Sequence, residues 1–234
     1  MRVHAIRARL QQVAQIVAPH RFKVDYIQAQ IDRLNAGLYV EIGVRDGATF
    51  RRVKCRRKIA VDPVRTEKML AIQPGESFFE ETSDRFFETS VVDALGGERI
   101  DVCLIDGLHV FEQVIRDVLN CAQWMRPDGV ILLDDCNPPS SERAQPIPTG
   151  GAWNGDVWKA IAVIRRTQPQ WHCMTFDTDQ GIGLIWGYES GAAGISEDDI
   201  AWAQGLKYED LDRDRSIIGL VPALARRELT SHRR

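Results

Sequence analysis

The segment 100–137 constrains the fold of this chain more than any other. It reads as a buried strand ending on Asp106, an amphipathic helix that follows His109, and a second buried strand ending on Asp134 and Asp135. Two apolar strands joined by one helix form a βαβ unit, whose parallel strands bring their acidic ends to the same edge of a sheet. Open α/β sheets bind ligands at that edge. The sequence therefore predicts an α/β fold with a site built from three aspartates and one histidine.

Length and composition favour one α/β domain without strong attraction to nucleic acid. The chain has 234 residues and a net charge of −3, from 30 Lys and Arg against 33 Asp and Glu. The cysteines are scattered and number five, which argues against a disulfide framework or a zinc site. No apolar run approaches the roughly 20 residues that cross a bilayer. We expect a soluble, cytoplasmic protein.

Three regions are expected along the chain. Residues 1–35 show apolar spacings typical of two helices, residues 36–188 hold the domain core, and residues 189–234 read as a helical tail. The N-terminal helices could cap the sheet, cover a substrate or pair with a second copy of the chain. The sequence leaves these alternatives open.

A glycine turn follows the first expected strand, 38–42. Gly43 and Gly47 allow a tight backbone turn, and a helix is expected from about Thr49, with its N–H groups facing a ligand. Asp62 ends the next strand about 20 residues beyond the turn, where a carboxylate holds a ribose diol in nucleotide-binding sheets. The turn is neither a dinucleotide fingerprint nor a Walker loop, and a purely structural role stays open.

Two further segments have alternative interpretations. The basic run 51–58 either contacts phosphate or is the solvated end of a helix. A third strand over 77–81 leads to Ser83 and Asp84. These two residues either help to bind a cofactor base or, in the case of Asp84, simply cap the next helix.

The second half of the chain predicts a long loop and a hairpin. Residues 136–155 are rich in Pro, Ser and Gly, as in a lid or substrate loop. Trp153 and Trp158 either line an aromatic pocket or belong to the core. The strands 172–176 and 183–186 are joined by a short turn, so the last strand should be antiparallel.

This order of elements resembles class I S-adenosylmethionine-dependent methyltransferases over about residues 36–188. The segments 105–109, 133–138 and 155–159 are similar to bacterial small-molecule or glycan methyltransferases of the family 24 type, with its DGxH motif. The resemblance implies a Rossmann-like, seven-stranded, mostly parallel sheet in the order 3-2-1-4-5-7-6. Its last strand is antiparallel, and helices cover both faces.

The resemblance also implies roles around the cofactor. Glu41, Gly43 and Gly47 would surround the methionine part of S-adenosylmethionine, and Asp62 would bind its ribose. Arg45 departs from the more usual GxGxG loop, and it would reach toward the cofactor carboxylate or point outward.

Two chemistries are open at the acidic edge. A second resemblance, to divalent-metal-dependent O-methyltransferases, implies that Asp106, Asp134 and Asp135 bind Mg²⁺, which would activate the acceptor oxygen. Alternatively His109 is the base, kept neutral by the helix that follows it, or it completes the metal shell. Asp106 would lie beside both cofactor and acceptor. A third possibility is that these carboxylates only cap helices.

The expected function is O-methylation of a small molecule or sugar. A non-catalytic cofactor-binding or assembly protein with the same fold is the alternative, and a nucleic-acid methyltransferase that uses the basic run is a weaker one. The expected partner is a small-molecule or glycan acceptor, with a homo-oligomer through the N-terminal helices as a further possibility. No membrane partner is expected, and the acceptor itself stays open.

Overall fold

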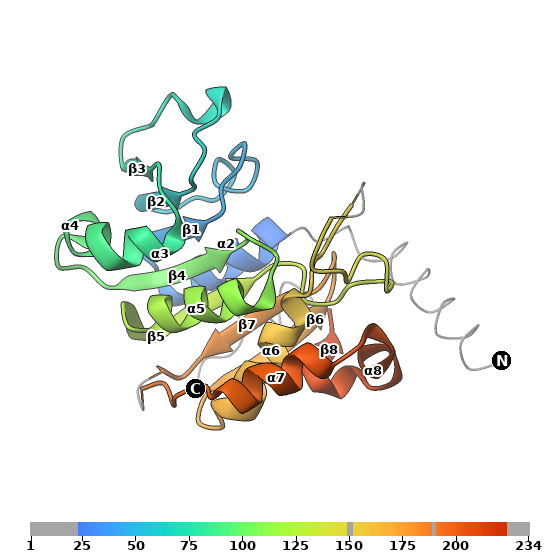
Figure 1. The fold of residues 1–234 in the computed structure, drawn as a ribbon. Helices are drawn as coiled ribbons and strands as arrows, with labels where there is room; N and C mark the ends of the chain where they lie inside the picture. The colour runs from blue at the N-terminus through green and yellow to red at the C-terminus, as the bar shows by residue number, and fades with distance from the viewer. Residues whose placement is uncertain (1–22, 149–151, 189–190, 224–234) are drawn as a thin grey trace.

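The computed structural model describes residues 23–148, 152–188 and 191–223 (Figure 1). The first expected helix of the N-terminal extension lies outside these residues. In the described part of the chain, eight strands form one sheet in the order β3-β2-β1-β4-β5-β7-β6-β8. The strands are β1 (Leu38–Ile42), β2 (Arg57–Val61), β3 (Glu76–Phe79), β4 (Ile100–Ile105), β5 (Met125–Leu133), β6 (His172–Asp177), β7 (Ile182–Trp186) and β8 (Leu220–Pro222).

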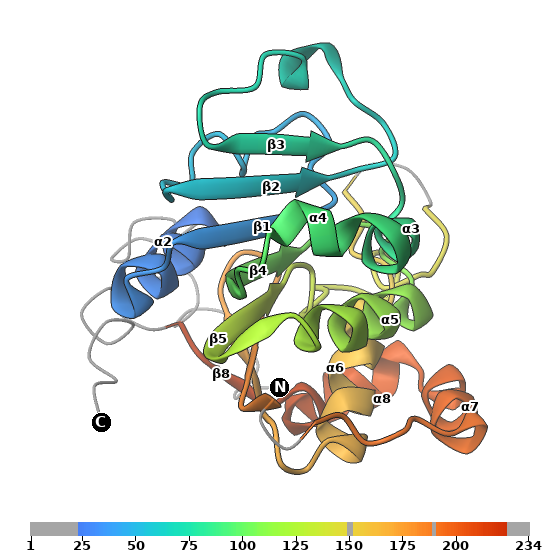
Figure 2. The same cartoon turned by 90° about the vertical axis from the view of Figure 1, so that its left-hand side faces the viewer.

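The predicted order of the first seven strands is confirmed, and β8 is an addition. Strands β3, β2, β1, β4 and β5 pair in parallel, whereas β7 is antiparallel to both β5 and β6. The short strand β8 pairs in parallel with β6 at the edge of the sheet. All parallel strands therefore end at the same edge, as the βαβ argument requires (Figure 2).

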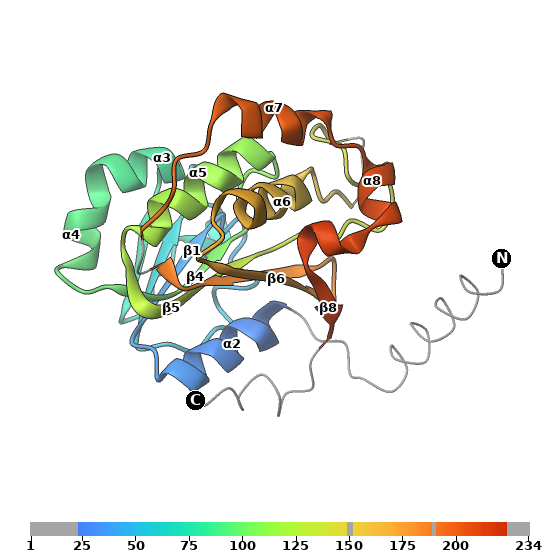
Figure 3. The ribbon, with the colours of Figure 1, turned by 90° about the horizontal axis from the view of Figure 1, so that it is seen from below.

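Helices cover both faces of the sheet unevenly. Figure 3 shows α2 on one face, and α3, α4, α5, α6 and α7 on the other. The α-helices are α2 (Lys23–Leu34), α3 (Ser83–Arg85), α4 (Val91–Leu95), α5 (Phe111–Ala122), α6 (Val157–Thr167), α7 (Glu197–Gly205) and α8 (Tyr208–Arg213), with a π-helical stretch over Phe86–Ser90 and 3-10 turns over Glu67–Met69 and Arg215–Ile218. No helix in the described ranges is long and apolar enough to span a membrane.

Each face of the sheet has its own apolar core. In β1, Leu38, Val40 and Ile42 belong to the core under α5 and α6, while Tyr39 belongs to the core under α2. Successive side chains of a strand point to opposite faces, so a strand covered on both sides is apolar at nearly every position. This explains why the central strands read as continuous apolar runs. All five cysteines are free thiols.

The prediction of a helix from about Thr49 is wrong. Residues 48–52 form turns, and Phe50 within them and Val53 just after them are buried. Their carbonyl oxygens accept from the buried ammonium of Lys58, at 2.8 and 3.1 Å, and not from the N–H groups of a following helical turn. The side chain of a neighbouring strand therefore takes over the backbone acceptors that a helix would have satisfied.

The basic run 51–58 also differs from its expected place at the end of a helix. Arg51 and Lys58 both form ion pairs with Glu76, which is nearly buried. Two arginines of the run pair with Glu98. These four cations therefore form ion pairs within the fold.

Helix α2 is fixed firmly to its face of the sheet. Its apolar side packs against β4 and β5, and the Tyr26 ring lies 5.1 Å from that of Phe176. Just after the helix, the Asp101 carboxylate accepts from the backbone N–H groups of Gly37 and Leu38, at 2.7 and 2.8 Å. These contacts fix the position of the first residue of α2, Lys23, relative to the strand ends.

Candidate active site

A cavity of about 920 Å³ opens at the carboxyl ends of β1, β2, β4 and β5. The sequence-predicted site residues line it, with the exception of Gly47. Those that line it are Glu41, Gly43, Arg45, Asp62, Ser83, Asp84, Asp106, His109, Asp134 and Asp135. The sheet topology thus gathers residues from four strand ends around one space.

The glycine turn brings two loops into close contact. Gly43 has a φ of 82°, and a Cβ there would lie 2.2 Å from the carbonyl oxygen of Asp106. Only glycine fits such a position without strain. Gly47 also has a positive φ, but it packs against the sulfur of Met69 and does not line the cavity.

Asp62 is held in the cavity by the glycine turn. One carboxylate oxygen accepts from the N–H of Arg45 at 2.7 Å, and the other accepts from the N–H of Val64 at 2.9 Å. Each oxygen retains acceptor capacity for a ligand. The side chain of Arg45 is exposed at the rim, while its backbone adopts a left-handed conformation with a φ of 51°.

Glu41 lies buried at the inner end of the cavity. The Tyr39 hydroxyl donates to its carboxylate at 2.6 Å. Burial raises the pKa of Glu41 to about 8, because the charged form loses its hydration. The side chain therefore stays close to neutral at physiological pH.

Ser83 and Asp84 also line the cavity, and both contact a side chain of α5. The amide of Gln113 is within hydrogen-bond distance of Ser83, Asp84 and Asp117, at 3.3, 3.0 and 2.9 Å. Burial raises the pKa of Asp117 to about 6. The expectation that Asp84 caps the helix is wrong, because Thr82 is the N-cap and accepts from the N–H three residues on.

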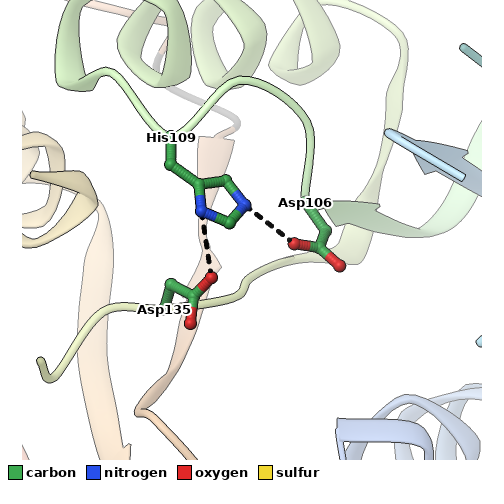
Figure 4. A group of neighbouring side chains, drawn as sticks. All are labelled: Asp106, His109 and Asp135. Atoms are coloured by element: carbon green, nitrogen blue, oxygen red, sulfur yellow. Dashed lines mark hydrogen bonds and ion pairs between the residues drawn. The ribbon is translucent and has the colours of Figure 1, made fainter. Parts of the chain in front are cut away.

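His109 lies between two carboxylates that come from different strands (Figure 4). Its Nε2 is 3.3 Å from an oxygen of Asp106, and its Nδ1 is 3.2 Å from an oxygen of Asp135. Each of the three residues offers one atom that could bind a metal ion, and these three atoms all lie within 4.8 Å of one another. The βαβ unit therefore assembles the cluster that its acidic strand ends predicted.

The carboxylates set the protonation of His109. Burial alone would lower its pKa, but the hydrogen bond to Asp106 and the charge of Asp135 raise it above the ordinary value. The net shift is therefore opposite in direction to the one expected from the helix start, which was predicted to keep the ring neutral. Burial and the charge of Asp134 in turn raise the pKa of Asp135.

Lys23 joins the cluster from the other face of the sheet. Its ammonium contacts one carboxylate oxygen of Asp106 and one of Asp134. Although burial opposes it, the pKa of Asp106 falls because His109 and Lys23 favour the charged form. Burial and Asp106 raise the pKa of Asp134 to about 6. The sequence alone did not point to Lys23.

The carboxylates expected to bind Mg²⁺ are thus divided between two cations. Asp106 and Asp134 share Lys23, while Asp135 pairs with His109. A divalent ion bound by all three would lie beside an ammonium of the same charge sign. As arranged here, the expected donor set does not fit such an ion.

The end of the long loop packs over the histidine. Trp153 stacks on the His109 ring, with 5.0 Å between ring centroids and 22° between planes. The amide of the fully buried Asn154 donates to Asp135 at 2.7 Å. Asp156 accepts from the first N–H of α5 at 2.9 Å, and its own N–H donates to the His109 carbonyl. The loop therefore positions two members of the cluster.

The two tryptophans singled out from the sequence have different places. Trp153 lines the cavity and is partly exposed. Trp158 is buried in the apolar core, with 1% of its surface exposed. The prediction that a tryptophan lines the cavity is thus confirmed for Trp153. For Trp158 it is wrong, because that side chain belongs to the core.

Comparison with known proteins identifies the fold. A family described as a methyltransferase domain matches residues 40–136. None of the curated proteins compared with the chain matches it.

Solved structures of similar fold include three that were determined with a bound cofactor or with SAH. An O-methyltransferase from Bacillus cereus in complex with SAH has a TM-score of 0.50 and 14% identity, over 76% of this chain and 88% of that one. A cofactor-bound protein from MTB has a TM-score of 0.51 and 16% identity, over 78% and 89%. A SAH-bound methyltransferase from Podospora anserina has a TM-score of 0.51 and 14% identity, over 75% and 85%.

These findings confirm the resemblance drawn from the sequence. The matched segment runs from β1 to just beyond β5 and includes the glycine turn, Asp62 and the DGxH motif. The chain has the α/β methyltransferase fold, with a mostly parallel sheet and an antiparallel β7.

Proposed function

We propose that this chain, in which residues 40–136 match a methyltransferase domain, transfers a methyl group from S-adenosylmethionine to an oxygen of a small molecule or sugar. One observation carries the proposal. A single cavity joins the glycine turn and Asp62 on one side to His109 and its carboxylates on the other. Its volume of about 920 Å³ leaves room for a cofactor and a small acceptor.

The residues at the glycine turn fit S-adenosylmethionine. Asp62 has acceptor capacity for both hydroxyls of a ribose, and it lies at the strand end where such sheets hold that sugar. Asp106, whose charged form His109 and Lys23 favour, also lines the cavity beside Gly43 and suits a cationic ligand. When bound, S-adenosylmethionine supplies a methyl group on a sulfonium, which is a good leaving group.

His109 is the group to which we assign removal of the proton from the acceptor hydroxyl. With the Nε2 proton donated to Asp106, which orients the ring, Nδ1 is the nitrogen that takes the proton, since it has no hydrogen-bond partner in the described part of the chain. Asp135, 3.2 Å from Nδ1, stabilises the positive charge that the ring gains. Trp153 covers one face of the ring and forms an apolar wall beside the acceptor. The same carboxylates raise the pKa of His109, which places the unprotonated base toward alkaline pH.

No step of this mechanism passes through Mg²⁺. The three carboxylates expected to bind it are already matched by Lys23 and His109. Activation of the oxygen without a metal therefore accounts for this arrangement of charges better than a bound metal.

Isothermal titration calorimetry tests the cofactor assignment. The protein should bind S-adenosylmethionine and not NAD. Asp62→Asn should weaken binding about tenfold or more, because the loss of a charged acceptor removes about 1.5–3 kcal/mol. The matched control Asp93→Asn changes an exposed carboxylate of α4, outside the cavity, and should leave binding unchanged.

Two results would count against the proposal. Absence of S-adenosylmethionine binding removes it altogether. Binding without methyl transfer to any of a panel of phenols, alcohols and sugars would favour the non-catalytic, cofactor-binding alternative.

A further inference from the structure

Lys23 occupies a bridging position at the acidic edge of the sheet. Its ammonium contacts carboxylate oxygens from the ends of two neighbouring strands, Asp106 after β4 and Asp134 after β5. These side chains are 22, 18 and 11% exposed, so the contacts are shielded from bulk water. A cation that joins two carboxylates at adjacent strand ends supplies positive charge beside Asp106, His109 and Asp135, the described side chains whose ligand atoms are close enough to hold a metal ion.

The position of Lys23 is set by the fold. It begins α2, whose Tyr26, Ile27 and Ile31 are buried against the sheet. The other end of the helix is tied to the sheet by Arg126, which donates to the carbonyl of Leu34 at 3.3 Å. A helix docked along its length presents Lys23 to the cluster at little further entropic cost.

We infer that Lys23 is the resident cation of this acidic cluster and takes the place of a divalent metal. Its charge compensates Asp106 and Asp134, which burial would otherwise make costly next to each other. An ammonium has three donor protons, and the two carboxylates engage two of them. The third is available to an acceptor oxygen in the cavity, which Lys23 also lines.

The inferred part in methyl transfer rests on the proposed function. There, Lys23 donates to the acceptor oxygen and favours its deprotonated form, while His109 takes the proton. The claim that Lys23 excludes a divalent ion from the cluster is independent of any activity, and it is the part tested below.

Binding of Mn²⁺, measured by electron paramagnetic resonance, tests that claim. The unmodified protein should bind no Mn²⁺ at the cluster. Lys23→Met should gain a site that binds about tenfold more tightly or better, because an ammonium no longer repels a dication a few ångströms away. The charge-retaining control Lys23→Arg should resemble the unmodified protein.

A second change identifies the site. Lys23→Met combined with Asp106→Asn should lose the gained Mn²⁺ affinity, since Asp106 belongs to every carboxylate set at this edge. Mg²⁺ should raise the unfolding temperature of Lys23→Met and not that of the unmodified protein.

Two outcomes overturn the inference. One is Mn²⁺ binding by the unmodified protein that Asp106→Asn abolishes, which would make the cluster a metal site. The other is a folded Lys23→Met protein, judged by circular dichroism, that gains no Mn²⁺ affinity. If Lys23→Met does not fold, Lys23→Gln takes its place, and Mn²⁺ binding by the unmodified protein that Asp106→Asn abolishes still overturns the inference. Failure to bind S-adenosylmethionine would instead refute the proposed function.

Discussion

At the scale of single residues, the three aspartates of the acidic edge share two cationic side chains. Lys23 lies against Asp106 and Asp134, and His109 lies between Asp106 and Asp135. Buried charge is costly unless it is paired, so these contacts explain how three aspartates coexist in one cavity. The same pairing tunes His109 as a base.

The pH dependence of catalysis should report this pairing. Because carboxylates raise the pKa of His109, the ring keeps its proton to higher pH, and the fraction of free base grows as pH rises through that pKa. We expect kcat/KM to increase with pH, with a midpoint above about 6.5, the ordinary value for imidazole. His109→Gln should lower kcat/KM about 10²-fold or more and flatten the profile.

An unchanged profile in His109→Gln would contradict the assignment of the base. A midpoint below that of free imidazole in the unmodified protein would contradict the role of the two carboxylates. Binding of S-adenosylmethionine to both proteins, measured alongside, separates loss of the base from loss of the cofactor.

Some site residues could be predicted from the sequence and others could not. Asp62, Asp106 and His109 follow apolar strands directly, so a local pattern and the geometry of parallel strands place them together. Lys23 is separated by 83 residues from Asp106 and by 111 from Asp134. No local pattern indicates such a partner, because only the packing of α2 on the sheet creates it.

At the scale of elements, the end of the long loop is a fixed part of the site. Asn154 reaches Asp135, Trp153 stacks on His109, and Asp156 caps α5. The sequence suggested a lid or substrate loop from its Pro and Gly content. What it could not reveal is that short polar side chains anchor the loop to the cluster.

Removal of the Asn154 amide tests the anchoring. Asn154→Ala should lower the free energy of unfolding by about 1–2 kcal/mol, since the buried carboxylate of Asp135 loses a donor. Urea unfolding measures this change, and limited proteolysis should cut the loop faster. The control Gln145→Ala alters an exposed side chain of the same loop and should show neither effect. Equal stability and equal proteolysis of the two variants would refute the anchoring role.

Prediction of elements succeeded where periodicity was clear and failed where a distant side chain intervened. The apolar stripe of α5 and the continuous apolar runs of β1 and β4 gave these elements correctly. The helix expected from Thr49 did not form, because Lys58 satisfies the carbonyls of that turn. Short strands such as β8 are too brief to leave a periodic signal.

At the scale of the whole molecule, the sheet topology divides the cavity into two halves. The ends of β1 and β2 supply the glycine turn and Asp62, and the ends of β4 and β5 supply the His109 cluster. The strand order places β1 beside β4, so the two halves meet at Gly43 and Asp106. The proposed methyl donor and acceptor would therefore face each other across this junction.

The most direct test is a crystal structure of the protein with S-adenosylhomocysteine, the product that methyl transfer leaves. The ribose hydroxyls should lie within hydrogen-bond distance of Asp62, with the sulfur directed toward Asp106 and His109. A complex with the nucleoside away from Asp62, or with the sulfur turned from the His109 cluster, would contradict the proposed division of the cavity.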